Sequence, residues 1–287
     1  ALENIAERMW DYESDDYEDC LRDYEARGDF RDSDREAFDA DREAFRDEIR
    51  RFERGIECLE WDITEGDGYV VDAFEAMNQT FIEKVTRDDG SMEYDSWRLF
   101  QLVFILRILP DIASREYDEW SDVPWRDGAD AENFSGDPME ALDLVDILWF
   151  PTGGGKTEAY LGLAIFTAFF DRKRGKRYGV SAWTRFPLRL LSLQQTQRIT
   201  ELLTNAEMIR LQDPDISGPE YLPFSLGYLV GSKNTPNKVS NYAKYGDDEA
   251  YLSEFTKYTG GEENGENRED IKVIPSCPVC GADVEIR

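Results

Sequence analysis

A glycine-rich stretch, PTGGGKT at 151–157, holds the residue types that bind phosphate groups. Its three glycines let backbone N–H groups turn toward an anion, because glycine adopts backbone angles that other residues avoid. Lys156 supplies a positive charge for the β- and γ-phosphates of a nucleotide, and Thr157 supplies a hydroxyl for Mg²⁺. We therefore expect ATP and Mg²⁺ as cofactors, with Lys156 and Thr157 as the catalytic candidates. The candidate nucleotide-binding residues here are Thr152, Gly153, Gly154, Gly155, Lys156, Thr157 and Glu158.

One position departs from the generic phosphate-binding pattern GxxxxGK[ST], which would place glycine where this chain has Phe150. A glycine-rich turn that carries a Lys-Thr pair by chance is the alternative interpretation. The context favours a nucleotide site, because an apolar run at 142–150 predicts a buried strand before the loop. Residues 156–170 predict a helix directly after it, whose positive N-terminal end would face the anion.

A Thr-Arg pair, Thr184 and Arg185, follows a second predicted strand at 178–183 and precedes a predicted helix. Such a position suits contacts with the phosphate backbone of a nucleic acid. Arg189 lies within that helix, where arginines are more often solvated or paired. Gly231 follows a third predicted strand, where glycine can equally serve a turn. These four residues are the nucleic-acid candidates.

The pattern CPVCG at 277–281 places Cys277 and Cys280 on a tight turn. Two thiolates with this spacing are half of the four-ligand set that a structural zinc ion needs. The chain contains no histidine, and its other two cysteines lie in distant segments that predict helices. We therefore expect the remaining zinc ligands beyond Arg287. A reduced thiol pair without metal is the alternative.

The elements that would position these residues alternate between short apolar runs and longer helical patterns from residue 141 onward. Strands that alternate with helices are typical of an α/β fold with a parallel sheet. The first part of the chain predicts helices alone, because its apolar residues recur at helical spacing. The expected elements are helices at 33–59, 71–85, about 95–110, 156–170 and 187–212, and strands at 142–150, 178–183 and 224–231.

These elements divide the chain into two expected domains. The first is an acidic α-helical region at 1–94. The second, at 95–287, is an ATP-binding domain. It would carry an insertion at about 111–140, where the chain is polar and acidic, and half a zinc knuckle at 277–281.

The chain is strongly acidic, with a formal net charge of -29 from 62 Asp and Glu against 33 Lys and Arg. Among the basic residues are 24 Arg and only 9 Lys. Dispersed acid with few lysines suits a halophilic cytosol of molar salt, where screening suppresses self-repulsion. An ordinary acidic protein that avoids nucleic acid is the alternative.

Residues 151–200 depart from this acidity, with 9 basic and 2 acidic residues. A positive window in a negative chain predicts a polyanion partner there. The longest uncharged apolar run, 161–170, is too short to span a bilayer, and no secretory signal is present. Four scattered cysteines do not indicate a disulfide scaffold. We therefore expect a cytoplasmic protein without a membrane partner.

The glycine-rich stretch resembles the PTGSGKT loop of superfamily 2 helicases. The stretch WRLFQ at 97–101 is similar to their LRPYQ element, whose glutamine amide reads adenine, so the resemblance adds Gln101 to the nucleotide-binding candidates. Gln101 lies about fifty residues before the loop, further than usual in these helicases, so 111–140 would have to be an insertion. A surface glutamine on an apolar helix is the alternative. The position of Thr184 and Arg185 resembles helicase motif Ia, which touches the tracking strand.

A longer set of segments resembles the helicases of DISARM antiphage systems over about 45–285. The segments are WRLFQLVFIL, WFPTGGGKTEAYLGL, RFPLRLLSLQQTQR, AEMIR and GYLVGSKNTPN, with modest departures at Phe186, Pro187, Ser192 and Thr196. The resemblance implies a RecA-like P-loop domain, incomplete in this chain. It also implies an ATP-hydrolysing helicase or translocase that acts on a DNA or RNA single strand, with defence-complex subunits as partners.

The acidic D-E-x-[HD] box of these helicases is not found after Thr157. The closest match, DDEA at 247–250, follows a polar segment instead of an apolar strand. Together with the start at Ala1, this leads us to expect a fragment that binds ATP without robust turnover. A P-loop kinase or small-molecule ATPase, and a non-catalytic scaffold that works through the acidic helices, are the alternative functions.

Overall fold

The computed structural model describes residues 1–28, 31–85, 96–119, 122–125, 145–151, 153–186, 189–228, 274, 276–278 and 280–284. Two compact units make up the chain, Ala1–Ala182 and Trp183–Arg287. The predicted domain boundary at 94/95 falls inside the first unit, where helices from both sides of it pack together.

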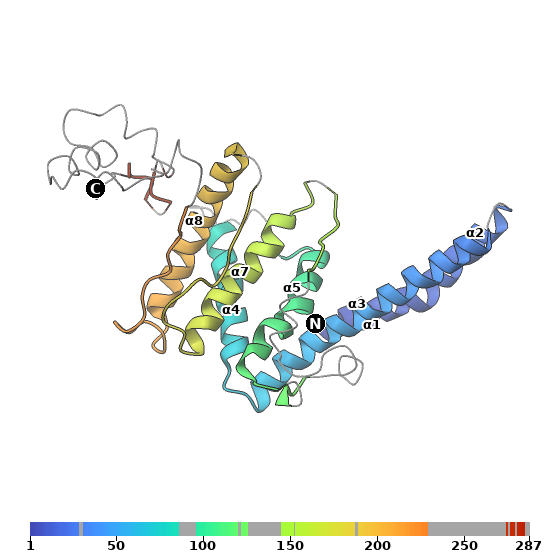
Figure 1. The fold of residues 1–287 in the computed structure, drawn as a ribbon, viewed down its shortest axis with the longest axis horizontal. Coiled ribbons are helices and arrows are strands. Elements are labelled where there is room, and N and C mark those ends of the chain that lie inside the picture. The colour runs from blue at the N-terminus through green and yellow to red at the C-terminus, as the bar shows by residue number, and fades with distance from the viewer. Residues whose placement is uncertain are drawn as a thin grey trace, which may run out of the picture. The chain divides into compact units, whose positions relative to one another are not determined.

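The first unit begins with a long helical hairpin. Helix α1 (Leu2–Asp11), the π-helix η1 (Tyr12–Asp16) and α2 (Tyr17–Ala26) follow one another and lie along α3 (Asp32–Thr64) (Figure 1). The two arms are antiparallel, because Trp10 donates a hydrogen bond to Glu53 at 2.8 Å while Glu25, near the other end, pairs with Arg35.

The rest of the first unit packs around α7 (Lys156–Lys173), with α4 (Tyr69–Val85) and α5 (Leu99–Ala113) against it (Figure 1). The short 3-10 helix η2 (Ser114–Glu116) continues α5. Helix α7 is apolar on nearly all sides, which is typical of a central buried helix. Its fully buried side chains include Phe166, Phe169 and Phe170.

Helices α3 and α5 approach each other closely at a glycine. Pro110 lies inside α5 and has no N–H to donate to the carbonyl of Leu106, four residues earlier. Gly55 of α3 packs against that carbonyl, and a Cβ on Gly55 would lie only 2.1 Å from the Leu106 oxygen. The expected helix stop near Pro110 is therefore wrong by one turn, because Pro110 is accommodated at this crossing.

The second unit is described mainly by α8 (Arg189–Gln212) and the turns that follow it. Glu207 of α8 accepts hydrogen bonds from Arg210 at 2.7 Å and from the backbone N–H of Phe224 at 3.0 Å. Further on, Ser276 and Asp283 form an isolated antiparallel bridge. In neither unit is any described helix both long and apolar enough to cross a membrane.

The predicted α/β fold is wrong for the part of the chain that the structure describes, because that part is helical and contains no strand. The described parts of the three expected strands, 145–150, 178–183 and 224–228, are irregular. Large apolar side chains there face solvent, such as Trp149 at 92% exposure. A parallel-sheet RecA-like domain is therefore not observed.

The reason for this error is that side chains, not a strand ladder, hold each of these segments to a helix. Arg107 of α5 pairs with Asp146 at 2.9 Å. Ser181 donates a hydrogen bond to Asp171 of α7 at 2.6 Å, and the Glu207–Phe224 bond acts likewise in the second unit. A short apolar run predicts extended backbone, but a sheet also needs a partner segment that local periodicity cannot specify.

Candidate functional site

The glycine loop leads directly into the N-terminus of α7. Gly153 and Gly155 have positive φ angles of 81° and 91°, a region that strongly favours glycine. The backbone N–H of Gly154 donates to the carbonyl of Pro151 at 3.1 Å, which closes a turn. Gly155 is the N-cap of α7 and Lys156 its first residue. The positive end of the α7 dipole therefore lies at the loop; the predicted loop residue Thr152 lies outside the described residues.

Two polar side chains contact this loop, that of Arg98, the N-cap of α5, and that of Gln101 in the first turn of α5. The Nε2 of Gln101 donates a hydrogen bond to the carbonyl of Gly155 at 2.7 Å. Nη1 of Arg98 donates to the carbonyl of Gly154 at 2.6 Å. Gln101 is 5% exposed, and its Oε1 accepts the backbone N–H of Arg98 at 2.9 Å, which caps α5. The structure thus brings Gln101 to the loop despite their separation in sequence.

Phe150 forms a third contact between the loop and α5. Its ring stacks on that of Phe100, with centroids 3.8 Å apart and planes inclined by 13°. The same ring covers Gly154, since a Cβ there would lie 2.6 Å from a ring carbon. This packing accounts for phenylalanine at the position where the generic pattern has glycine.

The two catalytic candidates lie in the first turn of α7 with Glu158. The ammonium group of Lys156 donates hydrogen bonds to the carbonyls of Phe150 and Pro151, the second at 3.2 Å. Thr157 and Glu158 are half-buried. A carboxylate in the first turn, such as that of Glu158, interacts favourably with the helix dipole.

Carboxylates of the first unit form ion pairs with several of the basic residues between positions 151 and 200. Lys173 pairs with Asp72 at 2.7 Å, and Arg174 with Glu116 at 2.8 Å. Lys176 pairs at 2.7 Å with Asp171, whose side chain is fully buried. These pairs reduce the net positive charge that residues 151–200 can present to a polyanion.

Asp171 organises the turn that follows α7. Burial acts to raise the pKa of Asp171. Hydrogen bonds from Lys176 and Ser181 and the charge of Arg115 outweigh burial and hold that pKa below its ordinary value. The ionised carboxylate therefore ties the basic turn to the end of α7.

The nucleic-acid candidates belong to the second unit, whereas the glycine loop belongs to the first. Thr184 and Arg185 are exposed and lie in irregular backbone, so the strand that was expected to present them is not observed. Arg189 begins α8, but its side chain lies outside the described residues, as does all of Gly231.

Cys277 and Cys280 lie on a tight turn, as their spacing predicts. The backbone N–H of Cys277 donates to the carbonyl of Ala282 at 2.7 Å, and that of Gly281 to the carbonyl of Cys277 at 2.9 Å. Within the residues that the structure describes, no group of three or more metal-ligating side chains is found. Cys58 is buried in α3, where burial raises its pKa well above the ordinary range.

Sequence reasoning did not single out Arg98 or Phe100. Both lie within the WRLFQ stretch that pointed to Gln101. Gln101 matches the second position of a capping box, but Arg98 is not among the residue types that mark an N-cap, so no sequence signal pointed to Arg98. No sequence signal predicted that the guanidinium group would reach Gly154.

Comparison with known proteins finds a similarity over part of the chain. No family model matches the chain. Over 148 residues the chain is 34% identical to the DISARM protein DrmA of Bacillus paralicheniformis. The matched region covers 48% of this chain and 12% of DrmA, so the chain spans a small part of that relative's length. The resemblance expected from the sequence motifs is thereby confirmed: over about half its length, the chain resembles DrmA.

Proposed function

We propose that this chain binds a nucleoside triphosphate at the glycine loop, as part of a helicase-related protein of antiphage defence. The observation that supports nucleotide binding is the geometry of the loop. Glycines with positive φ at 153 and 155 lead straight into the N-terminus of α7, where Lys156 is the first residue. An anion needs this combination of backbone N–H groups, helix dipole and cation.

The residues present fit a nucleotide with Mg²⁺. Gly153 and Gly155 would offer backbone N–H groups. Gly154 shapes the turn between them, because its own N–H donates to Pro151 and a Cβ there would lie 2.6 Å from the Phe150 ring. Lys156 would exchange its two carbonyl partners for phosphate oxygens, and Thr157 would offer a hydroxyl to the metal. Thr152 and Glu158 flank this set. Bound ATP supplies the free energy of phosphoryl transfer.

Calorimetric titration of the 287-residue chain with ATP and Mg²⁺ tests this proposal. Lys156→Ala removes the charged donor, so we expect affinity to fall about 10- to 100-fold. Lys173→Ala is the matched control, because it removes the same charge from the other end of α7 and should bind as the wild type does. Absence of binding by the wild type, or equal binding by Lys156→Ala, would contradict the proposal.

We expect binding without turnover, because the acidic box that holds Mg²⁺ and positions water in superfamily 2 helicases is not found after Thr157. A phosphate-release assay on the same chain measures this directly. Robust ATP hydrolysis by the wild type that Lys156→Ala abolishes would show that this chain supplies its own catalytic acid, and would refute this expectation.

The helicase-related role rests on the similarity to DrmA and on the exposed pair Thr184 and Arg185. The proposed track is a nucleic-acid single strand. Arg185→Ala should weaken single-strand binding and lower its dependence on salt by about one phosphate contact. Arg22→Ala, on the exposed face of α2, is the control. Equal binding by both variants would remove Thr184 and Arg185 from the proposed track.

The defence role rests on the name of the relative alone, with other subunits of such a system as the proposed partners. Phage plating on cells that carry the intact defence system measures it. We expect Lys156→Ala in this protein to restore plating toward that of undefended cells. Full protection by the variant would show that nucleotide binding at this loop is not needed for defence. The zinc site at Cys277 and Cys280 stays a prediction.

A further inference from the structure

We propose that Arg98 and Gln101 are positioning residues that orient two peptide groups of the glycine loop for phosphate binding, and that Gln101 does not read the base. This inference rests on the proposed nucleotide-binding function of the loop and assigns a role to side chains outside it. The structural feature behind it is that both side chains bond to carbonyls of the loop.

Because of the geometry of the peptide group, these two bonds also set the direction of two backbone N–H groups. In a trans peptide the C=O and N–H lie in one plane and point in opposite directions, and no cis peptide occurs among the described residues. Arg98 draws the carbonyl of Gly154 toward α5 at 2.6 Å, so the N–H of Gly155 points to the opposite side. Gln101 does the same to the carbonyl of Gly155 at 2.7 Å, which turns the N–H of Lys156 away from α5.

Two successive N–H groups are thereby directed to the same side of the loop, away from α5. Successive amides around a left-handed residue form a concave anion site, and Gly155 has the left-handed conformation. Arg98 and Gln101 therefore fix the orientation of two peptide groups that the glycines alone would leave free to rotate. Preorganised donors bind an anion more tightly, because less conformational freedom is lost on binding.

Both polar atoms of the Gln101 amide form hydrogen bonds with the protein backbone. Oε1 accepts from Arg98 at 2.9 Å and Nε2 donates to Gly155 at 2.7 Å, while the side chain is 5% exposed. Reading adenine would require both atoms to face a base. Only glycine at 155 permits the observed contact, since a Cβ there would lie 2.7 Å from Nε2.

The test compares three ligands that share a phosphate chain and differ in the base: ATP, GTP and inorganic triphosphate, each with Mg²⁺. Gln101→Met keeps the length and neutrality of the side chain and removes both hydrogen bonds. We expect the 287-residue variant to lose about 5- to 10-fold in affinity for all three ligands alike. Gln79→Met, on the exposed face of α4, is the control and should not change affinity.

Arg98 gives a second variant that keeps the positive charge. Arg98→Lys can still donate one hydrogen bond, so its loss of affinity should be smaller than that of Arg98→Met. The loss should again be the same for the three ligands. Because Arg98 is exposed, these variants are expected to fold even if Gln101→Met does not, and thermal unfolding of each variant checks this.

Two results would overturn the inference while the proposed function stands. In the first, Gln101→Met or Arg98→Met weakens ATP alone and leaves GTP and triphosphate unchanged, which identifies base reading. In the second, the folded variants bind all three ligands as tightly as the wild type. Failure of the wild type to bind any of the three would instead refute the proposed function, and this inference with it.

Discussion

At the scale of single residues, the glycine loop shows what a sequence motif can specify. The order of Gly153–Thr157 predicts a turn into a helix N-terminus, and the structure has that turn because the chemistry is local. The resemblance gave Gln101 as a nucleotide-binding candidate, but not its contact with Gly155, because nothing local connects positions 54 residues apart. Phe150 departs from the generic pattern, and the reason, its stacking on Phe100, depends on tertiary packing.

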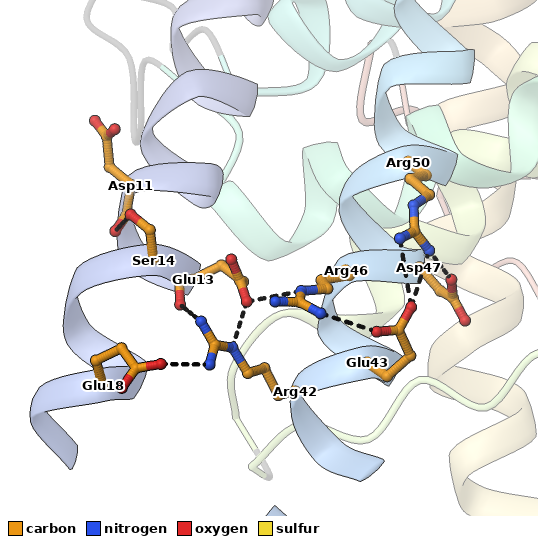
Figure 2. A network of polar contacts seen from close by, with 9 residues as sticks. All are labelled: Asp11, Glu13, Ser14, Glu18, Arg42, Glu43, Arg46, Asp47 and Arg50. Carbon is orange, nitrogen blue, oxygen red and sulfur yellow. Dashed lines mark hydrogen bonds and ion pairs between the residues drawn. The ribbon is translucent and has the colours of Figure 1, made fainter. Parts of the chain in front are cut away.

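Glu13 is a buried carboxylate that no sequence pattern singled out. The π-helix η1 directs it toward α3, where it pairs with Arg42 and, at 2.8 Å, with Arg46, while Arg42 also pairs with Glu18 at 2.7 Å (Figure 2). Burial acts to raise the pKa of Glu13, but hydrogen bonds from the two arginines outweigh it and hold the pKa below the ordinary 4.5. The ionised carboxylate therefore stabilises the hairpin.

Glu13→Gln is expected to lower the free energy of unfolding by about 1–2 kcal/mol at pH 7. A depressed folded pKa contributes stability that is present above pH 4.5 and is lost as the pH falls through the folded pKa. The difference between wild type and variant should therefore shrink below pH 4.5. Urea denaturation between pH 3 and pH 7 measures it, with Glu7→Gln on the exposed face of α1 as the control. A difference independent of pH would show that the charge of Glu13 is not what matters.

At the scale of elements, helices were predicted well and strands were not. The periodicity predicted helices at 33–59 and 71–85, and α3 (Asp32–Thr64) and α4 (Tyr69–Val85) confirm them. A helix satisfies its backbone hydrogen bonds within itself, so local sequence decides it. The expected strands needed partners elsewhere in the chain, and side chains from helices hold those segments instead.

Two glycines at helix crossings allow a test of whether a backbone atom or a side-chain atom limits the space for a new Cβ. Gly55→Ala should lower the free energy of unfolding by about 1–3 kcal/mol, because the new Cβ would meet the backbone carbonyl of Leu106, which cannot move aside. Gly162→Ala on α7 would meet the tip of Ile105 at 2.9 Å, a side chain that can rotate. The gain in helix propensity, about 1 kcal/mol, should then offset much of its cost. Urea denaturation ranks the variants, and a larger loss for Gly162→Ala would contradict this account of the α3–α5 crossing.

At the scale of the whole molecule, the net charge of -29 is the dominant physical property. Like charges destabilise a compact chain more than an expanded one, and salt weakens this repulsion as the screening length falls from about 30 Å at 0.01 M to about 3 Å at 1 M. Close ion pairs such as Glu13–Arg42 lose less, because their side chains are largely buried.

We therefore expect salt to stabilise this protein, by about 1 kcal/mol or more between 0.05 and 1 M KCl, which corresponds to about 2–4 °C in melting temperature. Choline chloride at the same ionic strength separates screening from specific binding of potassium, because screening depends on ionic strength and not on the identity of the cation. Equal shifts in the two salts would support dispersed self-repulsion, a shift in KCl alone would indicate a bound cation, and a melting temperature that falls with both salts would show that attractive surface pairs outweigh the excess of acid.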